Sequence, residues 1–484
     1  MNRNPQPTAA KLAIVSLLLS CLLSTASCLL AAQRQPNILF VLIDNLGKDW
    51  LDCYGSVEHQ TPNLDELART GIRFTHCYTT SYCSCTRALL YTGRYGRTTG
   101  WHTHHDTAIY GGGYLDWENE IHFARLLRNK GYATCIAGKW QLNDFYDPEQ
   151  AGFPDRHGFD EYLLWTGAIN GSGSAEKRHK DSLAAGLQTH NRIMESRYQD
   201  PVVFKNGERI EAVGEFGPEL YVDYLIDFMK RKHDQPFLAY YASPSVHRPL
   251  VPTPLNPDTP PDAPDRELWA GMVRYLDHQV GELVAALEKL DLRDKTIIVV
   301  TTDNGTWGGL GGNTIHGPVK AGLGRTSESG LDVPLIVNAP GLIKTPRVCT
   351  ALVDQSDFLP TFADLAGAPI PADLKLDGKS FAPLIHGTAS DADHRAWIYS
   401  QHADLRIIRD HRYKLYSTGE FFDLEQDHIE DHDLATSTEL AVTNARDRLT
   451  KILQSFPPDN HPFQPRSSFA FRLRDRGVSA RRLR

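Results

Sequence analysis

The chain has 484 residues, of which 41% are hydrophobic and 23% are charged, and its formal net charge is −8 at pH 7. A chain of this length and ordinary composition can bury a large core and is expected to form more than one domain. The negative charge excludes an overall basic surface for nucleic acid, so an anionic substrate would need a local cluster of cations.

Residues 1–32 have the pattern of an export signal. Arg3 and Lys11 precede an apolar run over residues 12–23, and small residues follow it. The run is shorter than a typical membrane span, so we expect no integral membrane span once the signal is cleaved. The residues before Cys28 lack the leucine of a usual lipoprotein site, which favours a periplasmic or secreted protein over a lipoprotein.

Five short apolar runs predict strands of one sheet. They cover residues 38–43, 134–137, 237–242, 297–300 and 335–337. Uninterrupted β-rich runs are typical of strands that are buried on both faces and are therefore parallel. The polar residues that follow the five runs are Asp44, Gly138-Lys139, His247, Thr301-Thr302-Asp303-Asn304 and Asn338. Because ligands bind at the carboxyl ends of parallel strands, we expect all of these residues around one site.

Helical patterns lie between the strands, over residues 63–70, 118–129, 218–232 and 268–290. The first has Thr61 as N-cap, Pro62 at the first helical position and Gly71 as C-cap. This alternation predicts an α/β sandwich, in which helices cover both faces of a mixed, mainly parallel sheet.

The pattern changes after about residue 390. Short strands are predicted over residues 397–400, 405–409, 413–416 and 421–424, and a helix over 439–454. We therefore expect a main catalytic domain over 33–390 and a small α+β subdomain with an antiparallel sheet over 391–465. Residues 466–484 are arginine-rich without apolar periodicity, which is typical of a flexible basic tail.

A cysteine motif carries the first indication of function. Cys83-Ser84-Cys85-Thr86-Arg87, followed by Ala88-Leu89-Leu90-Tyr91-Thr92-Gly93-Arg94, resembles the signature of the formylglycine-dependent sulfatases of the alkaline-phosphatase superfamily. Cys85 stands where that family usually has proline, and Thr86 where it has serine. The resemblance runs in unbroken order over residues 36–435. It implies an alkaline-phosphatase-like fold and a maturation enzyme that oxidises Cys83 to formylglycine, whose hydrate attacks the sulfur of a sulfate ester.

Two further motifs resemble the metal-binding motifs of the same family. Asp44-Asn45 follows the first strand, where the family normally has two aspartates, and Asp303-Asn304 follows the fourth. The resemblance implies one metal site formed by Asp44, Asn45, Cys83, Asp303 and Asn304. The Asp and Asn side chains offer only oxygen, which favours Ca²⁺ or Mg²⁺ over zinc. Taken singly, an aspartate after a strand is as often a helix cap, and Asn-Gly an ordinary turn.

Other segments resemble the family's substrate-binding elements. Arg87 belongs to the cysteine signature, and Lys139 matches a lysine that contacts the sulfate. Gln141 stands where the family has a histidine that helps to release sulfate, while His247 matches the general acid that protonates the leaving alcohol.

The family usually has a further sulfate-binding lysine at the position of Leu323. We expect Lys320 or Arg325 to supply that positive charge, since a guanidinium group binds a tetrahedral anion in a bidentate way. His102, His104 and His105 lie near in sequence and cannot be placed in space from it.

The favoured interpretation is an exported sulfatase that acts on a sulfated small molecule or polysaccharide. Three alternatives remain open. Cys83 is predicted just before a helix that begins near Thr86, where a lowered pKa would give an unmodified, reactive thiol. The residues Asn45, Gln141 and Leu323 leave open a pseudosulfatase that only binds sulfated glycans. A related phosphoesterase is the third. One or two disulfide bonds are a further possibility, and their pairing cannot be deduced from the sequence.

Overall fold

The computed structural model describes residues 35–58, 61–102, 114–143, 145, 152–165 and 196–456. The predicted export signal, the predicted basic tail, His104 and His105 lie outside these ranges. Within them, no helix is both long enough and apolar enough to cross a membrane. The six cysteines from Cys53 onward are all free, so the described residues form no disulfide.

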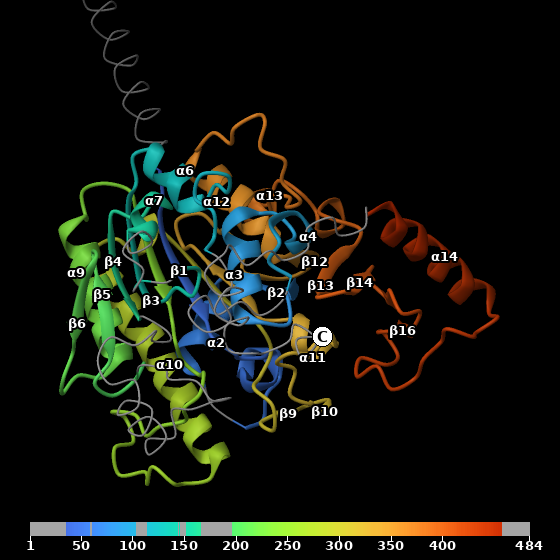
Figure 1. The fold of residues 1–484 in the computed structure, drawn as a ribbon, viewed down its shortest axis with the longest axis horizontal. Coiled ribbons are helices and arrows are strands. Elements are labelled where there is room, and N and C mark those ends of the chain that lie inside the picture. Colours follow the sequence, from blue (N-terminus) through green and yellow to red (C-terminus); the bar gives the residue numbers. More distant parts are fainter. Residues whose placement is uncertain are drawn as a thin grey trace, which may run out of the picture.

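A ten-stranded mixed sheet forms the centre of the molecule, in the order β12-β2-β11-β8-β1-β7-β3-β4-β5-β6 (Figure 1). In chain order these strands are β1 Asn37–Ile43, β2 Ile72–Tyr78, β3 Ala133–Lys139, β4 Glu161–Trp165, β5 Val202–Lys205, β6 Glu208–Glu211, β7 Phe237–Ala242, β8 Thr296–Thr302, β11 Leu335–Asn338 and β12 Arg347–Asp354. The five strands from β8 to β4 run parallel to one another. The prediction of a mainly parallel sheet is confirmed.

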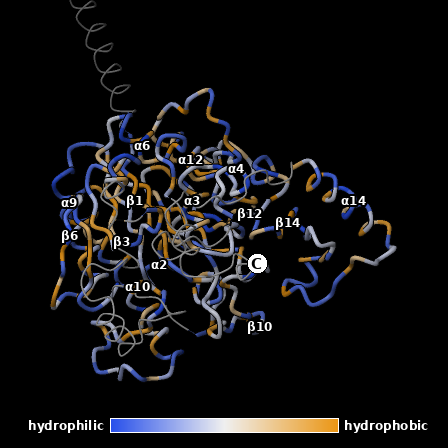
Figure 2. Tube along the Cα trace, viewed as in Figure 1, coloured by the Kyte–Doolittle hydropathy of each residue, from blue (hydrophilic) through white to orange (hydrophobic). Residues whose placement is uncertain are grey.

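Helices cover both faces of this sheet because each buried strand sends alternate side chains to opposite sides. In β1, Ile38, Phe40 and Leu42 belong to one core cluster, whereas Leu39 and Val41 belong to the other. The first cluster includes side chains of α3 Cys83–Thr92, α6 Phe123–Asn129, α12 Phe358–Ala366 and α13 Ala382–Ile385. The second includes α2 Pro62–Thr70, α9 Gly217–Arg231 and α10 Asp265–Lys289. Figure 2 shows apolar segments along the central strands.

A second, four-stranded antiparallel sheet follows, as predicted (Figure 1). Its strands are β13 Ile398–His402, β14 Leu405–Arg409, β15 Tyr413–Tyr416 and β16 Phe421–Asp423, and α14 Leu440–Ser455 packs on them. The remaining short elements are α4 Gly96–Thr99, α7 Phe153–Arg156, α11 Glu328–Leu331, β9 Asn313–Thr314, β10 Gly317–Pro318, and 3₁₀ turns at Lys48–Trp50, Asp52–Tyr54, Arg293–Lys295, Gln355–Asp357 and Asp391–Asp393.

One strand direction differs from the prediction. The run over 335–337 forms β11, which is antiparallel to both of its neighbours, β2 and β8. Its last residue, Asn338, pairs with Ile298 near the start of β8, so it lies at the opposite edge of the sheet. There its amide donates to the carbonyl of Leu67 at 2.8 Å. The expectation that Asn338 joins the site is therefore wrong.

Two helix starts also differ from the sequence prediction. The helix expected over 118–129 begins at Phe123, because the Nδ1 of His122 accepts the N–H of Ala124 and caps it. The helix expected near Thr86 begins at Cys83 itself. The motif cysteine thus lies in the first turn of α3 and not ahead of it.

Candidate active site

Four strands deliver polar side chains to one edge of the parallel sheet. Asp44 follows β1, Lys139 is the last residue of β3, His247 lies in the loop after β7, and Asp303 follows β8. These strands are neighbours in the order β8-β1-β7-β3, so their carboxyl ends lie side by side. The N–H of Asp303 donates to the carbonyl of Ile43 at 3.0 Å, which ties the two central strand ends together.

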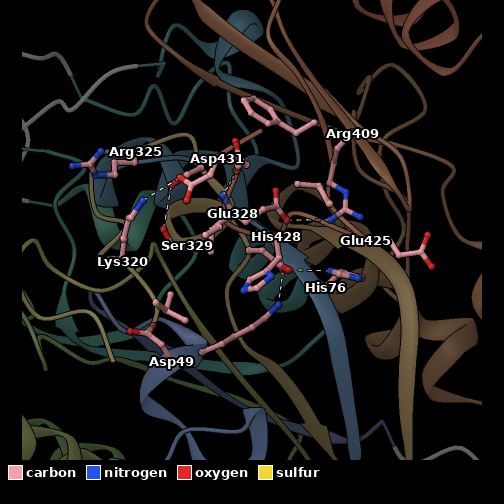
Figure 3. Close-up of a pocket in the computed structure, with 18 of the residues that line it drawn as sticks. Asp49, His76, Lys320, Arg325, Glu328, Ser329, Arg409, Glu425, His428 and Asp431 are labelled. Atoms are coloured by element: carbon pink, nitrogen blue, oxygen red, sulfur yellow. Dashed lines mark hydrogen bonds and ion pairs between the residues drawn. The ribbon is translucent and has the colours of Figure 1, made fainter. Parts of the chain in front are cut away.

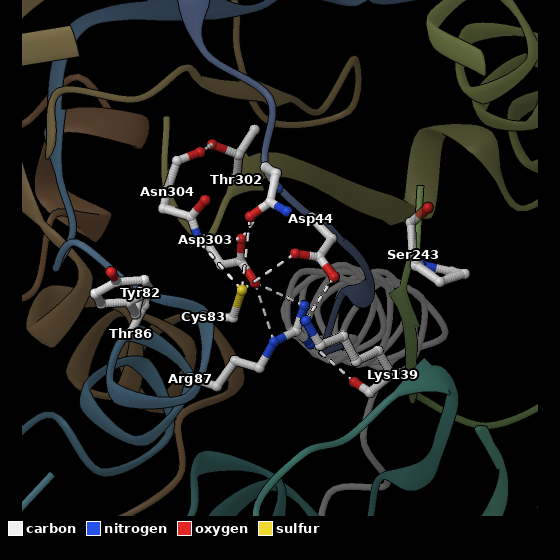
Figure 4. Close-up of polar contacts among 12 residues, drawn as sticks. Asp44, Tyr82, Cys83, Thr86, Arg87, Lys139, Ser243, Thr302, Asp303 and Asn304 are labelled. Carbon is white, nitrogen blue, oxygen red and sulfur yellow. Dashed lines mark hydrogen bonds and ion pairs between the residues drawn. The ribbon is translucent and has the colours of Figure 1, made fainter. Parts of the chain in front are cut away.

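The thiol of Cys83 points into this group of strand ends (Figure 4). It lies 3.3 Å from the Oδ1 of Asp44 and 3.6 Å from the Oδ1 of Asn45. The side-chain amide of Asn304 donates to the sulfur at 3.3 Å. A residue of α3 is thereby placed among the side chains that follow β1 and β8.

Arg87 lies one helical turn after Cys83, so both side chains extend from the same face of α3. Its guanidinium is fully buried and donates to the Oδ2 of Asp303 from Nε at 3.1 Å and from Nη2 at 2.8 Å. The Nη1 donates to the carbonyl of Lys139 at 2.8 Å. The spacing of four residues in the motif therefore connects α3 to β8 and β3.

The two carboxylates of the site differ in electrostatic environment. The ammonium of Lys139 lies 2.6 Å from the Oδ2 of Asp44. Although burial alone would raise it, the pKa of Asp44 is held below its usual value by Lys139 and then by His247, Arg87 and Arg197. Burial, together with the charge on Asp44, raises the pKa of Asp303, against the effect of Arg87.

The prediction of a lowered pKa for the Cys83 thiol is wrong when only burial and the protein's own charged side chains act on it. Burial raises the pKa of the Cys83 thiol well above its usual value, and the nearby carboxylates of Asp303 and Asp44 raise it further. The cations Lys139 and Arg87 oppose this effect without reversing it. An unmodified Cys83 is therefore a thiol and a weak nucleophile in these surroundings.

The donor set fits a divalent cation. Asp44, Asn45, Asp303 and Asn304 are fully buried, and their side chains supply oxygen. The Oδ1 of Asn304 has no hydrogen-bond partner among the described residues, which is costly for a buried acceptor unless a ligand satisfies it. Ligand atoms of Asp44, Cys83 and His247 lie within 4.8 Å of one another. Oxygen-rich donors of this kind suit Ca²⁺ or Mg²⁺.

His247 faces the same group of residues. Its Nδ1 lies 2.7 Å from the carbonyl of Arg248, so Nδ1–H donates there and Nε2 is left for the site. Burial, and then the positive charge of Arg197, lower the pKa of His247 well below its usual value. Gln141 follows β3 with a positive φ of 67°, and its Oε1 is buried without a hydrogen-bond partner among the described residues.

The structure does not bring Lys320 and Arg325 into this group. The ammonium of Lys320 forms an exposed ion pair with Asp431 at 3.2 Å, and Arg325 is exposed. Both line a different cavity of about 990 Å³ between the main sheet and the C-terminal sheet (Figure 3). Among the described residues, neither side chain forms a hydrogen bond or an ion pair with Cys83 or Asp44.

Arg197 is a site residue that the sequence analysis missed. It is 2% exposed, and its Nη1 lies 3.8 Å from the Oδ2 of Asp44. It precedes β5 in a polar stretch without a periodic pattern, so no signal in the sequence marked it. The site therefore contains three buried basic side chains, Arg87, Lys139 and Arg197, around two aspartates.

Comparisons with known proteins agree with this geometry. The family model described as "Sulfatase" matches residues 36–368, and the model "N-sulphoglucosamine sulphohydrolase, C-terminal" matches residues 326–456. Arylsulfatase A of Bos taurus is 32% identical over 404 residues, which cover 80% of this chain and 76% of that protein.

Two further relatives extend the comparison. N-acetylgalactosamine-6-sulfatase of Canis lupus familiaris is 31% identical over 373 residues, covering 74% of this chain and 67% of that protein. The solved structure of Ps i-CgsB in complex with k-i-k-neocarrahexaose has a TM-score of 0.72 at 26% identity, covering 93% of this chain and 99% of that one. The family model covers more than half of the chain and includes every strand end described above. The chain therefore belongs to the sulfatase family and is a sulfuric ester hydrolase.

Proposed function

We propose that this protein is an exported sulfatase that hydrolyses sulfate esters of sulfated carbohydrates, with formylglycine derived from Cys83 and one divalent cation in its active site. The observation that supports it most is the position of the Cys83 sulfur, 3.3 Å from a carboxylate oxygen of Asp44 and 3.3 Å from the amide of Asn304. A nucleophile made at this atom lies beside the cation site and beside Arg87.

Position 83 supplies the nucleophile in this proposal. The hydrate of formylglycine would offer a hydroxyl group that is a better nucleophile than the buried thiol. The raised pKa of Cys83 supports modification over direct attack by sulfur, since little thiolate would form. A formylglycine-generating maturation enzyme is then a required partner, and Cys83 must reach it before the fold buries the side chain.

The residues of the strand ends hold the substrate and the cation. Asp44, Asn45, Asp303 and Asn304 would hold Ca²⁺ or Mg²⁺, and position 83 would lie beside it; the cation would neutralise charge on the sulfate oxygens. Lys139 presents its ammonium at the same edge and is positioned to bind the sulfate. Arg87 holds Asp303 in place through two hydrogen bonds.

His247 is proposed to give a proton to the leaving alcohol from Nε2, since Nδ1–H is bound to a backbone carbonyl. The lowered pKa of His247 means that the neutral ring is favoured before substrate binds. The negative charge of a bound sulfate ester favours the imidazolium form and would oppose that effect. Gln141 has no titratable proton and is assigned only to substrate binding.

Two named relatives support a carbohydrate substrate. One was solved with k-i-k-neocarrahexaose, and the other is an N-acetylgalactosamine-6-sulfatase. Export is proposed from the pattern of residues 1–32. The division into a catalytic domain over 33–390 and a subdomain over 391–465 is part of the same proposal, supported by a separate sheet that begins at β13.

Peptide mass analysis of active protein, made in a host with the maturation enzyme, tests the proposal. We expect the mass of formylglycine at position 83 and a thiol at position 85. Cys83→Ala should abolish hydrolysis of an aryl sulfate, while Cys85→Ala, a matched change at an equally buried cysteine two residues away, should leave measurable activity. Active protein that carries only a thiol at position 83 would contradict the assignment.

A further inference from the structure

Arg197 is held rigidly beside the strand ends of the site. Its guanidinium carbon lies 4.0 Å from the ring centroid of Trp165, the last residue of β4, which fixes the plane of the group by a cation–π contact. The backbone of Arg197 also packs closely on the start of α9, where a Cβ at Gly217 would come within 2.2 Å of the Arg197 carbonyl oxygen. Glycine at 217 therefore permits this close approach of α9.

The next residue connects Arg197 to the loop that carries His247. The hydroxyl of Tyr198 donates to the carbonyl of His247 at 2.5 Å and lies 3.0 Å from that of Pro244. Arg197 and His247 are thus positioned by one set of contacts. A movement of either backbone would be transmitted to the other.

The guanidinium has an unused donor at the site. Its Nη1 makes no hydrogen bond to any described residue, although the side chain is only 2% exposed. The Oδ2 of Asp44 lies 3.8 Å away, beyond hydrogen-bond distance, and already receives the ammonium of Lys139 at 2.6 Å. A buried charged donor without an acceptor is costly, so this geometry points to a ligand with oxygen acceptors.

We infer that Arg197 is a sulfate-binding residue of this enzyme and supplies the positive charge that Leu323 lacks. The inference rests on the proposed function, because the ligand is the sulfate group of the same substrate. From its place beside Lys139, the Nη1 donates to a sulfate oxygen. A planar guanidinium suits a tetrahedral anion, because it can donate two parallel hydrogen bonds to its oxygens.

A purely structural role is the competing explanation. In that case Arg197 would only balance the charge of Asp44, and its removal would weaken folding or cation binding. A substrate-binding role acts on affinity for sulfate and leaves the bound cation in place. Metal content and sulfate affinity therefore separate the two explanations.

The experiment compares the full-length, matured protein with Arg197→Met, Arg197→Gln and a control, Arg209→Met. Arg209 lies on β6 in an exposed ion pair with Glu211, so the control removes the same charge away from the site. The probes are 4-nitrophenyl sulfate as substrate and inorganic sulfate as competitive inhibitor. Bound calcium and magnesium are measured in every variant.

We expect Arg197→Met to raise both KM and the inhibition constant of sulfate by about 10- to 100-fold, as for loss of a charge-assisted hydrogen bond. The value of kcat and the metal content should change much less, and the control should match the wild type. An unchanged sulfate inhibition constant, or metal loss in step with activity, overturns the inference. If Arg197→Met does not fold, the same criteria apply to Arg197→Gln. Wild-type protein that neither hydrolyses the ester nor binds sulfate would instead contradict the proposed function itself.

Discussion

Two regions of the molecule bury several charged side chains, and they differ in how those charges are satisfied. One is the group of strand ends around Cys83 (Figure 4), and the other is the wall of the cavity between the main sheet and the C-terminal sheet (Figure 3). Both contain lysines, arginines and carboxylates from distant parts of the chain. Only the first retains polar atoms that the described protein leaves without partners.

At the cavity, the buried cations Lys414 and Arg409 are both paired with carboxylates. The ammonium of Lys414 lies 3.1 Å from Glu328, 2.9 Å from Glu430 and 2.7 Å from the carbonyl of Thr326. Arg409 forms a second ion pair with Glu328 at 3.2 Å. These contacts join β14 and β15 to the segment around α11. The buried ion pairs therefore hold the four-stranded C-terminal sheet against the rest of the protein.

At the strand ends, by contrast, the Nη1 of Arg197 and the Oδ1 of Asn304 have no hydrogen bond among the described residues. Three cations and two carboxylates are gathered there without closing into a fully bonded network. The comparison indicates that buried charge with all of its partners supports the fold, whereas buried charge with unused donors and acceptors is prepared for a ligand.

The largest effect expected from this difference comes from the cation site. Asp303→Ala should abolish activity and remove the bound cation, because it deletes one proposed ligand and also frees Arg87 from its two hydrogen bonds to Asp303. Asp431→Ala removes a carboxylate from the cavity wall and should change neither property. Metal analysis and aryl sulfate hydrolysis measure both. Retained cation and activity in Asp303→Ala would show that the ligand assignment is wrong.

A second expected effect concerns proton transfer at the strand ends. His247→Ala should lower the rate by about 10²–10⁴-fold for sulfate esters with poor leaving groups, because general-acid assistance is lost. Activated aryl sulfates need less protonation and should lose less. The ratio of kcat values for an alkyl and an aryl sulfate measures this difference. An equal loss on both substrates would assign His247 to binding rather than to proton donation.

Substitutions at the cavity wall should change the stability of the protein rather than its catalytic rate. Lys414→Met leaves Glu430 without its cation and Glu328 with Arg409 alone, and should lower the free energy of unfolding by about 3–5 kcal/mol. Lys320→Met removes only an exposed pair with Asp431 and should change that free energy by less than about 1 kcal/mol. Urea denaturation measures both variants. A greater loss of stability in Lys320→Met than in Lys414→Met would contradict the conclusion that the buried ion pairs stabilise the fold.

The sequence predicted the centre of the fold well, because uninterrupted apolar runs such as residues 38–43 have few uses other than a buried strand. It could not predict the direction of β11, since a strand buried on both faces has the same pattern in either direction. The error at Asn338 followed directly from that ambiguity.

The candidate site shows the same division. Asp44 and Asp303 could be predicted to meet because each directly follows a strand, and adjacent parallel strands fix their positions. Lys320 was misplaced because the path of a loop is not encoded in its spacing from a motif. Arg197 was missed because its guanidinium lies over the ring of Trp165 and its backbone packs against Gly217, and these are tertiary contacts without a local pattern.

The smallest expected effect comes from Asn45, where this chain departs from the family's pair of aspartates. Its φ of 67° is left-handed, a conformation that aspartate also tolerates, so Asn45→Asp should fold without backbone strain. A third carboxylate beside Asp44 and Asp303 adds negative charge to the site. We expect cation affinity to rise by about 10-fold, in line with the dependence of calcium affinity on ligand charge.

The same variant should be less stable than the wild type when the cation is removed, because three buried carboxylates then repel one another without compensation. Chelator titration followed by thermal unfolding, with and without added calcium, measures the two effects on one sample. If the variant matches the wild type both in cation affinity and in thermal stability after chelation, the side chain of residue 45 lies outside the cation site. The opposite signs of the two expected effects make this a sharper test than activity alone, since a simple folding defect would lower both.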